Sequence, residues 1–241
     1  MQGDLSDSRA AIAWGESQLP ILAGRIRSWE ADGLKVVPID PNPQSDKKLA
    51  IVRIEQPLPD IIHAEVGVII GSFRSSLDLL GATLALRRGI IPNREHHFPI
   101  FRSLYDFIDP LDGIENKKWL SPTDIKIIKA LRPYNGGNDL LWSLHQLDIL
   151  RKHERLIAAI FSIHSFAVFG RGIQFHIRDF SDLKDETVLF EFPRNEPQPK
   201  VQLSIEIIFD EVGLSVYREP LLVTLVDFAH MATGIVDSFD I

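Results

Sequence analysis

The chain of 241 residues contains no cysteine. It can therefore form no disulfide framework, thiol nucleophile or cysteine-bound zinc site. An excess of positive charge is also absent, because 33 acidic residues outnumber 26 lysines and arginines and give a net charge of −7. This balance argues against general binding to nucleic acid or to an anionic membrane, although it leaves room for a local basic groove.

Long apolar runs and a secretory leader are lacking too. We find no apolar run near the length of a membrane span, and the residues after Met1 are polar rather than a signal-peptide core. The sequence has no phosphate-binding loop, dinucleotide fingerprint or nucleophile elbow. We therefore expect a soluble cytoplasmic protein without a cofactor.

The spacing of apolar residues predicts a helix-rich first part, residues 1–165. A helix is expected over 8–31, where Pro20 should kink or split it. A β-hairpin is expected near 36–55, because two short apolar strands flank a segment of turn residues. The further predicted helices of this part are 65–88, 103–107, 121–132 and 138–163.

A period of two begins at residue 166 and predicts a β-rich segment, 166–216. Its expected strands are 166–169, 173–177, 187–192 and 201–208, with connecting loops at 179–185 and 193–199. A C-terminal helix is expected over 220–239. Helices, then strands, then a helix predict a single α+β domain over 1–241: a helical bundle combined with a mostly antiparallel β-sheet.

Two of the predicted helices carry charge on faces that should be buried. At about 100° per residue, Arg74 and Asp78 share a stripe with the small residues Gly67, Gly71 and Gly81. Small residues let a second helix approach closely, and the i,i+4 spacing allows an ion pair within the helix. This stripe is the expected contact face for another helix.

The helix predicted over 138–163 has an apolar stripe that includes Leu144 and Leu147. Charged residues interrupt or flank this stripe. They are Asp148, Arg151 and Arg155 within it, and His145 and Lys152 beside it. Together with Arg74 and Asp78, these five residues form the candidate polar site, in which we assign no catalytic residue.

Three interpretations of the candidate polar site are open. Buried charge is costly unless it is paired, so the two faces can meet in a salt-bridge lock that fixes helix register. Arginine pairs also suit bidentate oxyanion binding, which would make the site a cleft for an anionic small molecule such as a phosphate. In the third interpretation the charges are solvated.

The segments Phe73-Arg-Ser-Ser-Leu-Asp-Leu79 and Arg132-Pro-Tyr-Asn-Gly-Gly-Asn138 resemble segments of a family of uncharacterised bacterial proteins. The later Leu144-His-Gln-Leu-Asp148 and the loop Phe98-Pro-Ile100 fit the same family pattern. The resemblance covers most of the chain. That family has no established activity, so the resemblance implies a fold more than a function.

The first of these segments also resembles the Arg-x4–6-His motif of the HEPN superfamily. Its members are helical, often dimeric, and in several cases ribonucleases. The resemblance implies that Arg74 is the motif arginine, which acts at an RNA phosphate. Leu79 stands where the pattern has histidine, and neither Leu80 nor Gly81 can transfer a proton. The catalytic version of the motif is therefore incomplete.

Adjacent His96 and His97 are the other feature with metal-binding chemistry, since aspartates follow them along the chain. One ion needs three or more ligands, so we expect a solvated polar loop and no metal site.

Two function hypotheses follow from the sequence. The first is a non-catalytic binding or interaction module that forms a homodimer through its helical face. The second is a HEPN-like ribonuclease or RNA-binding protein that uses Arg74, Asp78, His145 and Arg151. The partners considered are a second copy of the chain, an anionic small molecule or RNA, and no membrane.

Overall fold

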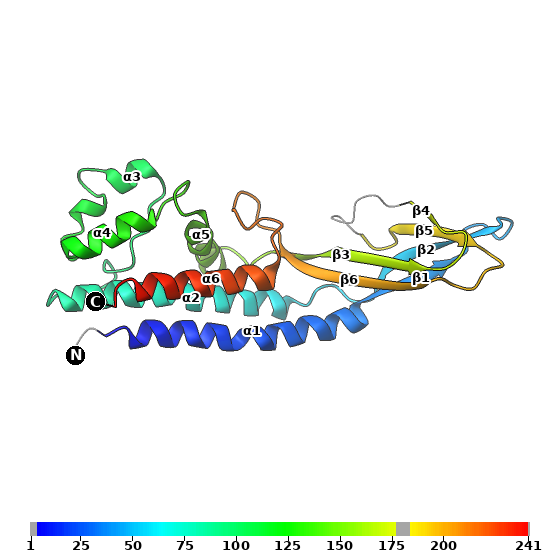
Figure 1. The fold of residues 1–241 in the computed structure, drawn as a ribbon, viewed down its shortest axis with the longest axis horizontal. Helices are drawn as coiled ribbons and strands as arrows, with labels where there is room; N and C mark the ends of the chain where they lie inside the picture. The colour runs from blue at the N-terminus through cyan, green and yellow to red at the C-terminus, as the bar shows by residue number, and fades with distance from the viewer. Residues whose placement is uncertain (1–3, 177–183, 241) are drawn as a thin grey trace.

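A computed structural model describes residues 4–176 and 184–240 of the chain (Figure 1). The molecule is elongated, with its helices at one end and its strands at the other. Both ends of the chain lie at the helical end, where Arg9 forms ion pairs with Asp237 and Asp240. The predicted α+β class is confirmed, because helices and antiparallel sheets make up the fold.

Three long helices lie side by side in the helical half: α1 (Ser6–Gly33), α2 (Asp60–Arg87) and α6 (Leu221–Asp237). The shorter α5 (Asp139–His153) packs across α2 and is seen nearly end-on in Figure 1. The remaining helices are α3 (Leu104–Ile108), η1 (Ile114–Asn116) and α4 (Pro122–Leu131). At α4 the predicted start is confirmed: Ser121 and Asp124 form a capping box, with Pro122 in the first turn.

The strands form two antiparallel sheets in the β-rich half. The first has the order β1-β2-β5-β4, made of β1 (Leu34–Ile39), β2 (Lys47–Ile54), β5 (Val188–Pro193) and β4 (Gln174–Phe175). The second pairs β3 (Ala159–Phe169) with β6 (Lys200–Phe209). Apolar side chains of the two sheets face each other around a small core that includes Phe190 and Phe192. The predicted hairpin is confirmed by the pairing of β1 with β2.

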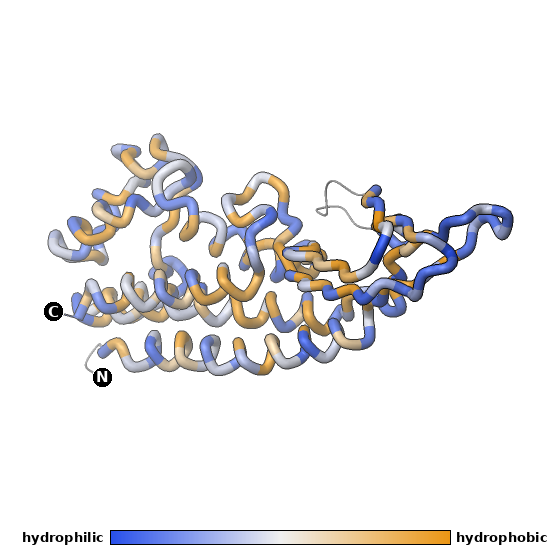
Figure 2. Tube along the Cα trace, turned by 45° about the vertical axis from the view of Figure 1, so that its right-hand side comes forward, coloured by the Kyte–Doolittle hydropathy of each residue, from blue (hydrophilic) through white to orange (hydrophobic). Residues whose placement is uncertain are grey.

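Helix α2 is the core of the helical half. Its 28 residues are long and apolar enough to cross a membrane, which corrects our expectation that no such run exists. Within its most apolar window, 67% of the residues are buried against the rest of the molecule. That is the pattern of a core helix in a soluble protein. Figure 2 shows hydrophobic residues along the packed helices and hydrophilic residues at the far tip of the strands.

Some predicted boundaries are wrong. Helix α2 begins at Asp60 rather than at Glu65. Helix α1 continues through Pro20, so the proline does not split it. The helix expected over 138–163 ends at His153, and the residues from Ala159 onward form β3. The apolar residues around 159–163 show no periodicity that distinguishes a buried helix from a strand. In the structure they form a strand because they pair with β6.

The other expected strands are found with small shifts. Strand β5 corresponds to 187–192 and β6 to 201–208, while 166–169 is the end of β3. The strand predicted over 173–177 is reduced to the two residues of β4, and residue 177 lies outside the described residues, as does 179–183 of the predicted loop.

Candidate functional site

Glycines on α2 create the contact between α2 and α5. A Cβ atom at Gly71 would lie 1.8 Å from Nη2 of Arg151, and one at Gly67 would lie 3.5 Å from that side chain. The Arg151 side chain therefore lies directly on the α2 backbone. The expectation that these small residues admit a second helix is confirmed. At Gly81 the close neighbour is different, because the loop backbone at His96 takes the space.

Arg74 is buried where α2, α5 and the loop before Pro99 meet. Only 3% of the residue is exposed. Its Nη1 lies 2.7 Å from Oδ1 of Asp78 in an ion pair that lacks hydrogen-bond alignment. Its Nη2 donates to the carbonyl oxygen of Phe98 at 3.2 Å, and its Nε donates to Nδ1 of His145 at 3.4 Å. All three guanidinium nitrogens thus face groups of the protein itself.

His145 is neutral and accepts the hydrogen bond from Arg74. Burial lowers the pKa of His145 to about 4, and the positive charge of Arg74 is the second cause of the shift. The negative charge of Asp148 acts in the opposite direction. The ring is therefore neutral at pH 7. A neutral imidazole that accepts at Nδ1 carries its proton on Nε2. His145 joins α5 to α2 as an acceptor, and no positive charge accumulates beside Arg74.

Asp148 is the centre of the second group of charges. It is buried on α5, and Oδ1 accepts from Nε of Arg151 at 2.8 Å. Its Oδ2 accepts from Nζ of Lys152 at 2.6 Å. One buried carboxylate is thereby paired with two cations from the same helix, at spacings of three and four residues. Within the described residues, no ion pair connects this group to Arg74 or Asp78.

The single network considered from the sequence is therefore divided. Arg74, Asp78 and His145 form one group, and Asp148, Arg151 and Lys152 form the other. Both lie at the contact between α2 and α5. The described side chains leave no buried charge of either group unpaired, since every one has an ionic or hydrogen-bonded partner.

Arg155 does not belong to the site, which corrects its assignment. It follows the end of α5, and its guanidinium forms two bonds to the buried carboxylate of Glu211, at 2.9 and 2.7 Å. The Glu211 carboxylate raises the pKa of Arg155 and also accepts from the backbone N–H of Ala158 at 2.6 Å. Sequence reasoning missed Glu211, because an acid that follows a strand carries no local sign of burial. The pair fixes the start of β3 against the segment after β6.

His96 and His97 lie in the loop whose backbone packs against Gly81 of α2. Nδ1 of His96 accepts from the backbone N–H of Asn93 at 3.0 Å, and its ring meets Trp119 edge-on at 5.4 Å. Across residues 4–176 and 184–240, no group of three or more metal-ligating side chains is found.

Comparison with protein-family models, with curated proteins and with solved structures finds no match to this chain. The resemblances to an uncharacterised bacterial family and to the HEPN superfamily therefore stay predictions.

Proposed function

We propose that this protein is a non-catalytic interaction module and that the candidate polar site is a salt-bridge lock between α2 and α5. The geometry of Arg74 supports this reading. Each of its nitrogens already faces a protein acceptor, and almost none of its surface is exposed. A phosphate would have to displace those partners before it could bind. An anionic small molecule is for the same reason a weaker candidate partner.

One observation carries the interaction role: an apolar groove of about 240 Å³ between α1 and α2. Four large apolar side chains along it are each about half exposed: Trp14, Ile21, Ile61 and Val68. A contiguous exposed apolar surface of this kind is typical of a protein interface. We name this surface the α1–α2 face.

The occupant we propose for the α1–α2 face is a second copy of the chain. A twofold axis brings the same apolar patch onto itself, and each copy then supplies two long helices to a four-helix contact. The Arg25–Glu65 ion pair lies beside the groove and would form part of its polar rim. A cytoplasmic location belongs to the same proposal and is supported by the absence of cysteine.

Sedimentation velocity over a range of protein concentrations tests self-association. The unmodified protein is expected to sediment as a dimer, and the double substitution Trp14→Glu with Val68→Glu as a monomer. Ile91→Glu is the matched control, because Ile91 is a highly exposed apolar residue away from this face. A monomer at every concentration of the unmodified protein would overturn the proposal.

A second candidate function, a HEPN-like ribonuclease or RNA-binding protein, has one observation in its favour. His145 reaches Arg74 from another helix and could stand in for the histidine that Leu79 replaces. Incubation with single-stranded RNA tests this candidate. Cleavage that Arg74→Ala abolishes, in a variant with an unchanged circular dichroism spectrum, would place the ribonuclease first. No cleavage by the unmodified protein or by Leu79→His would remove it.

A further inference from the structure

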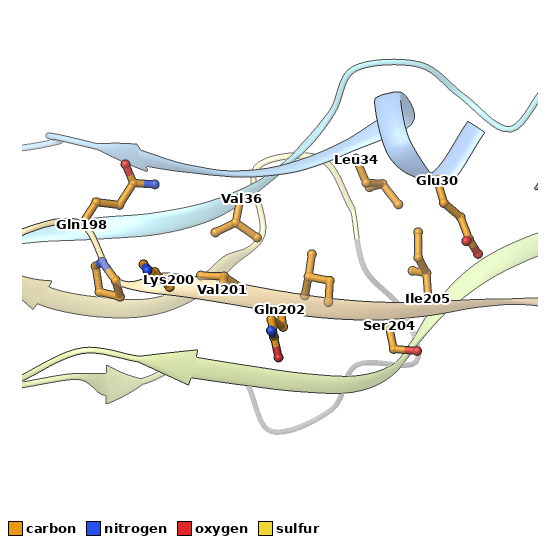
Figure 3. A pocket seen from close by; sticks show the side chains of 11 residues that line it. Glu30, Leu34, Val36, Gln198, Lys200, Val201, Gln202, Ser204 and Ile205 are labelled. Carbon is orange, nitrogen blue, oxygen red and sulfur yellow. The ribbon is translucent and has the colours of Figure 1, made fainter. Parts of the chain in front are cut away.

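A groove of about 860 Å³ lies between strands β1 and β6 in the β-rich half. Figure 3 shows Val36 of β1 above it and Val201 and Ile205 of β6 below it. The two strands belong to different sheets, and within the described part of the chain no hydrogen-bonded pairing joins them. The groove is thus bordered by the free edges of two strands.

The backbone of β6 presents unused hydrogen-bonding groups to this groove. The N–H of Phe209 donates to the carbonyl of Glu219, so the polar groups of Phe209 point away from β3. Strand polarity alternates from residue to residue. The N–H and C=O groups of Val201, Leu203 and Ile205 therefore point to the same free edge. Among the described residues, none of these three forms a further backbone bond there.

The chain itself already pairs with one end of this edge. Arg218 donates to the carbonyl of Phe209 at 2.9 Å, and Pro220 forms an antiparallel bridge with Ile208. At Leu221 the chain turns into α6 and leaves the edge. A smaller cavity lined by Ile207 and Pro220 continues the groove at this point. The edge therefore accepts an antiparallel segment, and most of its length is left open.

The β1 side of the groove is less suited to pairing. The carbonyl oxygen of Gly33 accepts from the backbone N–H groups of Glu55 and Gln56. Because backbone polarity alternates along a strand, the N–H and C=O groups of Lys35 and Val37 also point towards β2. The backbone polar groups of Val36 and Pro38 consequently point to the free edge, where proline has no N–H to donate. Proline at an edge strand is a common protection against pairing. The unprotected edge is that of β6.

Charge differs between the two ends of the groove. Glu30 lies at the end nearest α1, and Lys200 lies near the opposite end (Figure 3). Burial raises the pKa of Glu30, with Arg27 opposing the shift, and no described residue forms an ion pair or hydrogen bond with its carboxylate. Between the two ends the lining is mixed: Val36, Val201 and Leu203 are apolar, and Gln202 and Ser204 are polar.

We infer that this groove binds an extended segment of a partner protein, which adds antiparallel to β6 with apolar side chains at alternate positions. Its first residue is basic and faces Glu30, and its last is acidic and faces Lys200. Main-chain bonds to a free edge supply affinity in such complexes, and alternate side chains supply specificity. The inference rests on the proposed role as an interaction module but uses a different surface from the α1–α2 face.

Two peptides of identical composition test the inference by isothermal titration calorimetry. The probe is acetyl-Lys-Val-Thr-Val-Thr-Val-Glu-amide, and its control is acetyl-Glu-Val-Thr-Val-Thr-Val-Lys-amide. The control is expected to bind about fivefold more weakly, because both of its charges face like charges. Equal binding of the two peptides, or no binding of the probe, would overturn the inference.

N-methylation of the probe separates strand addition from simple apolar contact. Methyl groups on one alternate set of backbone nitrogens remove the donors that face β6, and methyl groups on the other set leave them in place. Binding is expected to be lost with at least one set. Undiminished binding with both sets would exclude main-chain pairing and overturn the inference.

Glu30→Gln provides the protein-side test, with Glu55→Gln as the matched control at an exposed residue outside the lining. The first substitution is expected to reduce the preference for the probe to about twofold, and the second to leave it unchanged. If Glu30→Gln instead changes the sedimentation of the protein, a second copy occupies the groove and the inference fails. A dimer that persists without peptide binding would overturn the groove assignment alone.

Discussion

The two halves of the molecule treat their polar groups in opposite ways. In the helical half, buried charges are closed off by partners from the same chain, as Arg74 and Asp148 illustrate. In the β-rich half, the interior is apolar, but the edge of β6 leaves main-chain donors and acceptors open along a groove. From this difference we infer that buried charge here holds the structure together, whereas the open edge of β6 is available to a partner.

The largest expected effects come from opening a cavity in each half. Phe73→Ala in the helical core and Phe190→Ala in the sheet core should each lower the free energy of unfolding by about 3–5 kcal/mol. Leu34, Phe161 and Ile205 pack against both cores, so we expect one cooperative transition for the whole chain. Urea unfolding of the two variants followed by tryptophan fluorescence measures this, because all four tryptophans lie in the helical half. A midpoint that Phe190→Ala leaves unchanged would show that the halves unfold independently.

Removing the central carboxylate of the α5 group should have the next largest effect. Asp148→Leu leaves Arg151 against the α2 backbone without its counter-charge, and we expect a loss of about 3 kcal/mol. Arg151→Leu should cost less, about 1–2 kcal/mol, because Lys152 still pairs with the carboxylate. Urea midpoints of the two variants test this order. Equal and negligible losses would mean that the charges are solvated.

His145 should make the helical half sensitive to acid. Its pKa is about 4 in the folded protein and about 6.5 when unfolded, so the unfolded chain binds more protons between these values. The resulting stability is complete above pH 6.5 and is lost as the pH falls towards 4. From pH 6.5 to 5 the unfolding free energy should fall by about 1.5 kcal/mol. His145→Asn keeps an acceptor for Arg74 and should remove this part of the dependence, as urea titrations at both pH values would reveal.

Adding a methyl group at Gly71 of α2 should change the free energy of unfolding least among these substitutions. Gly71→Ala displaces the flexible end of Arg151 from the helix backbone, and the gain in helix propensity offsets part of that cost. We expect a net loss of about 1 kcal/mol. The same substitution made together with Arg151→Ala should cost nothing further, because the clash is gone. Strict additivity in this double-mutant cycle would contradict the contact.

Local signals made part of this fold predictable. Helix α4 could be placed from Ser121 and Pro122 because a cap and a first-turn proline act within a few residues. The β1–β2 hairpin followed from a turn between two apolar strands. The end of α5 could not be placed, since the segment after it becomes a strand only by pairing with β6, more than thirty residues away in the chain.

The candidate site divides along the same line. The Arg74–Asp78 and Asp148–Lys152 pairs have helical spacing, so sequence could anticipate them. A helical wheel could suggest the contact between Arg74 and His145, because both residues lie on regular helices. The partner of Arg155 was not, because Glu211 belongs to a loop whose position depends on the whole sheet.

The apolar character of α2 also has a consequence for the order of events during synthesis. Helix α2 is complete at Arg87, but α6, which packs against it, begins at Leu221. At usual rates of translation the ribosome needs on the order of ten seconds to make the intervening chain. For that time the nascent chain carries a segment with the length and hydrophobicity of a membrane span and without one of its covering helices. Until α6 emerges, only α1 and the other earlier elements can cover α2, and the length of this interval is set by the distance along the chain between α2 and α6.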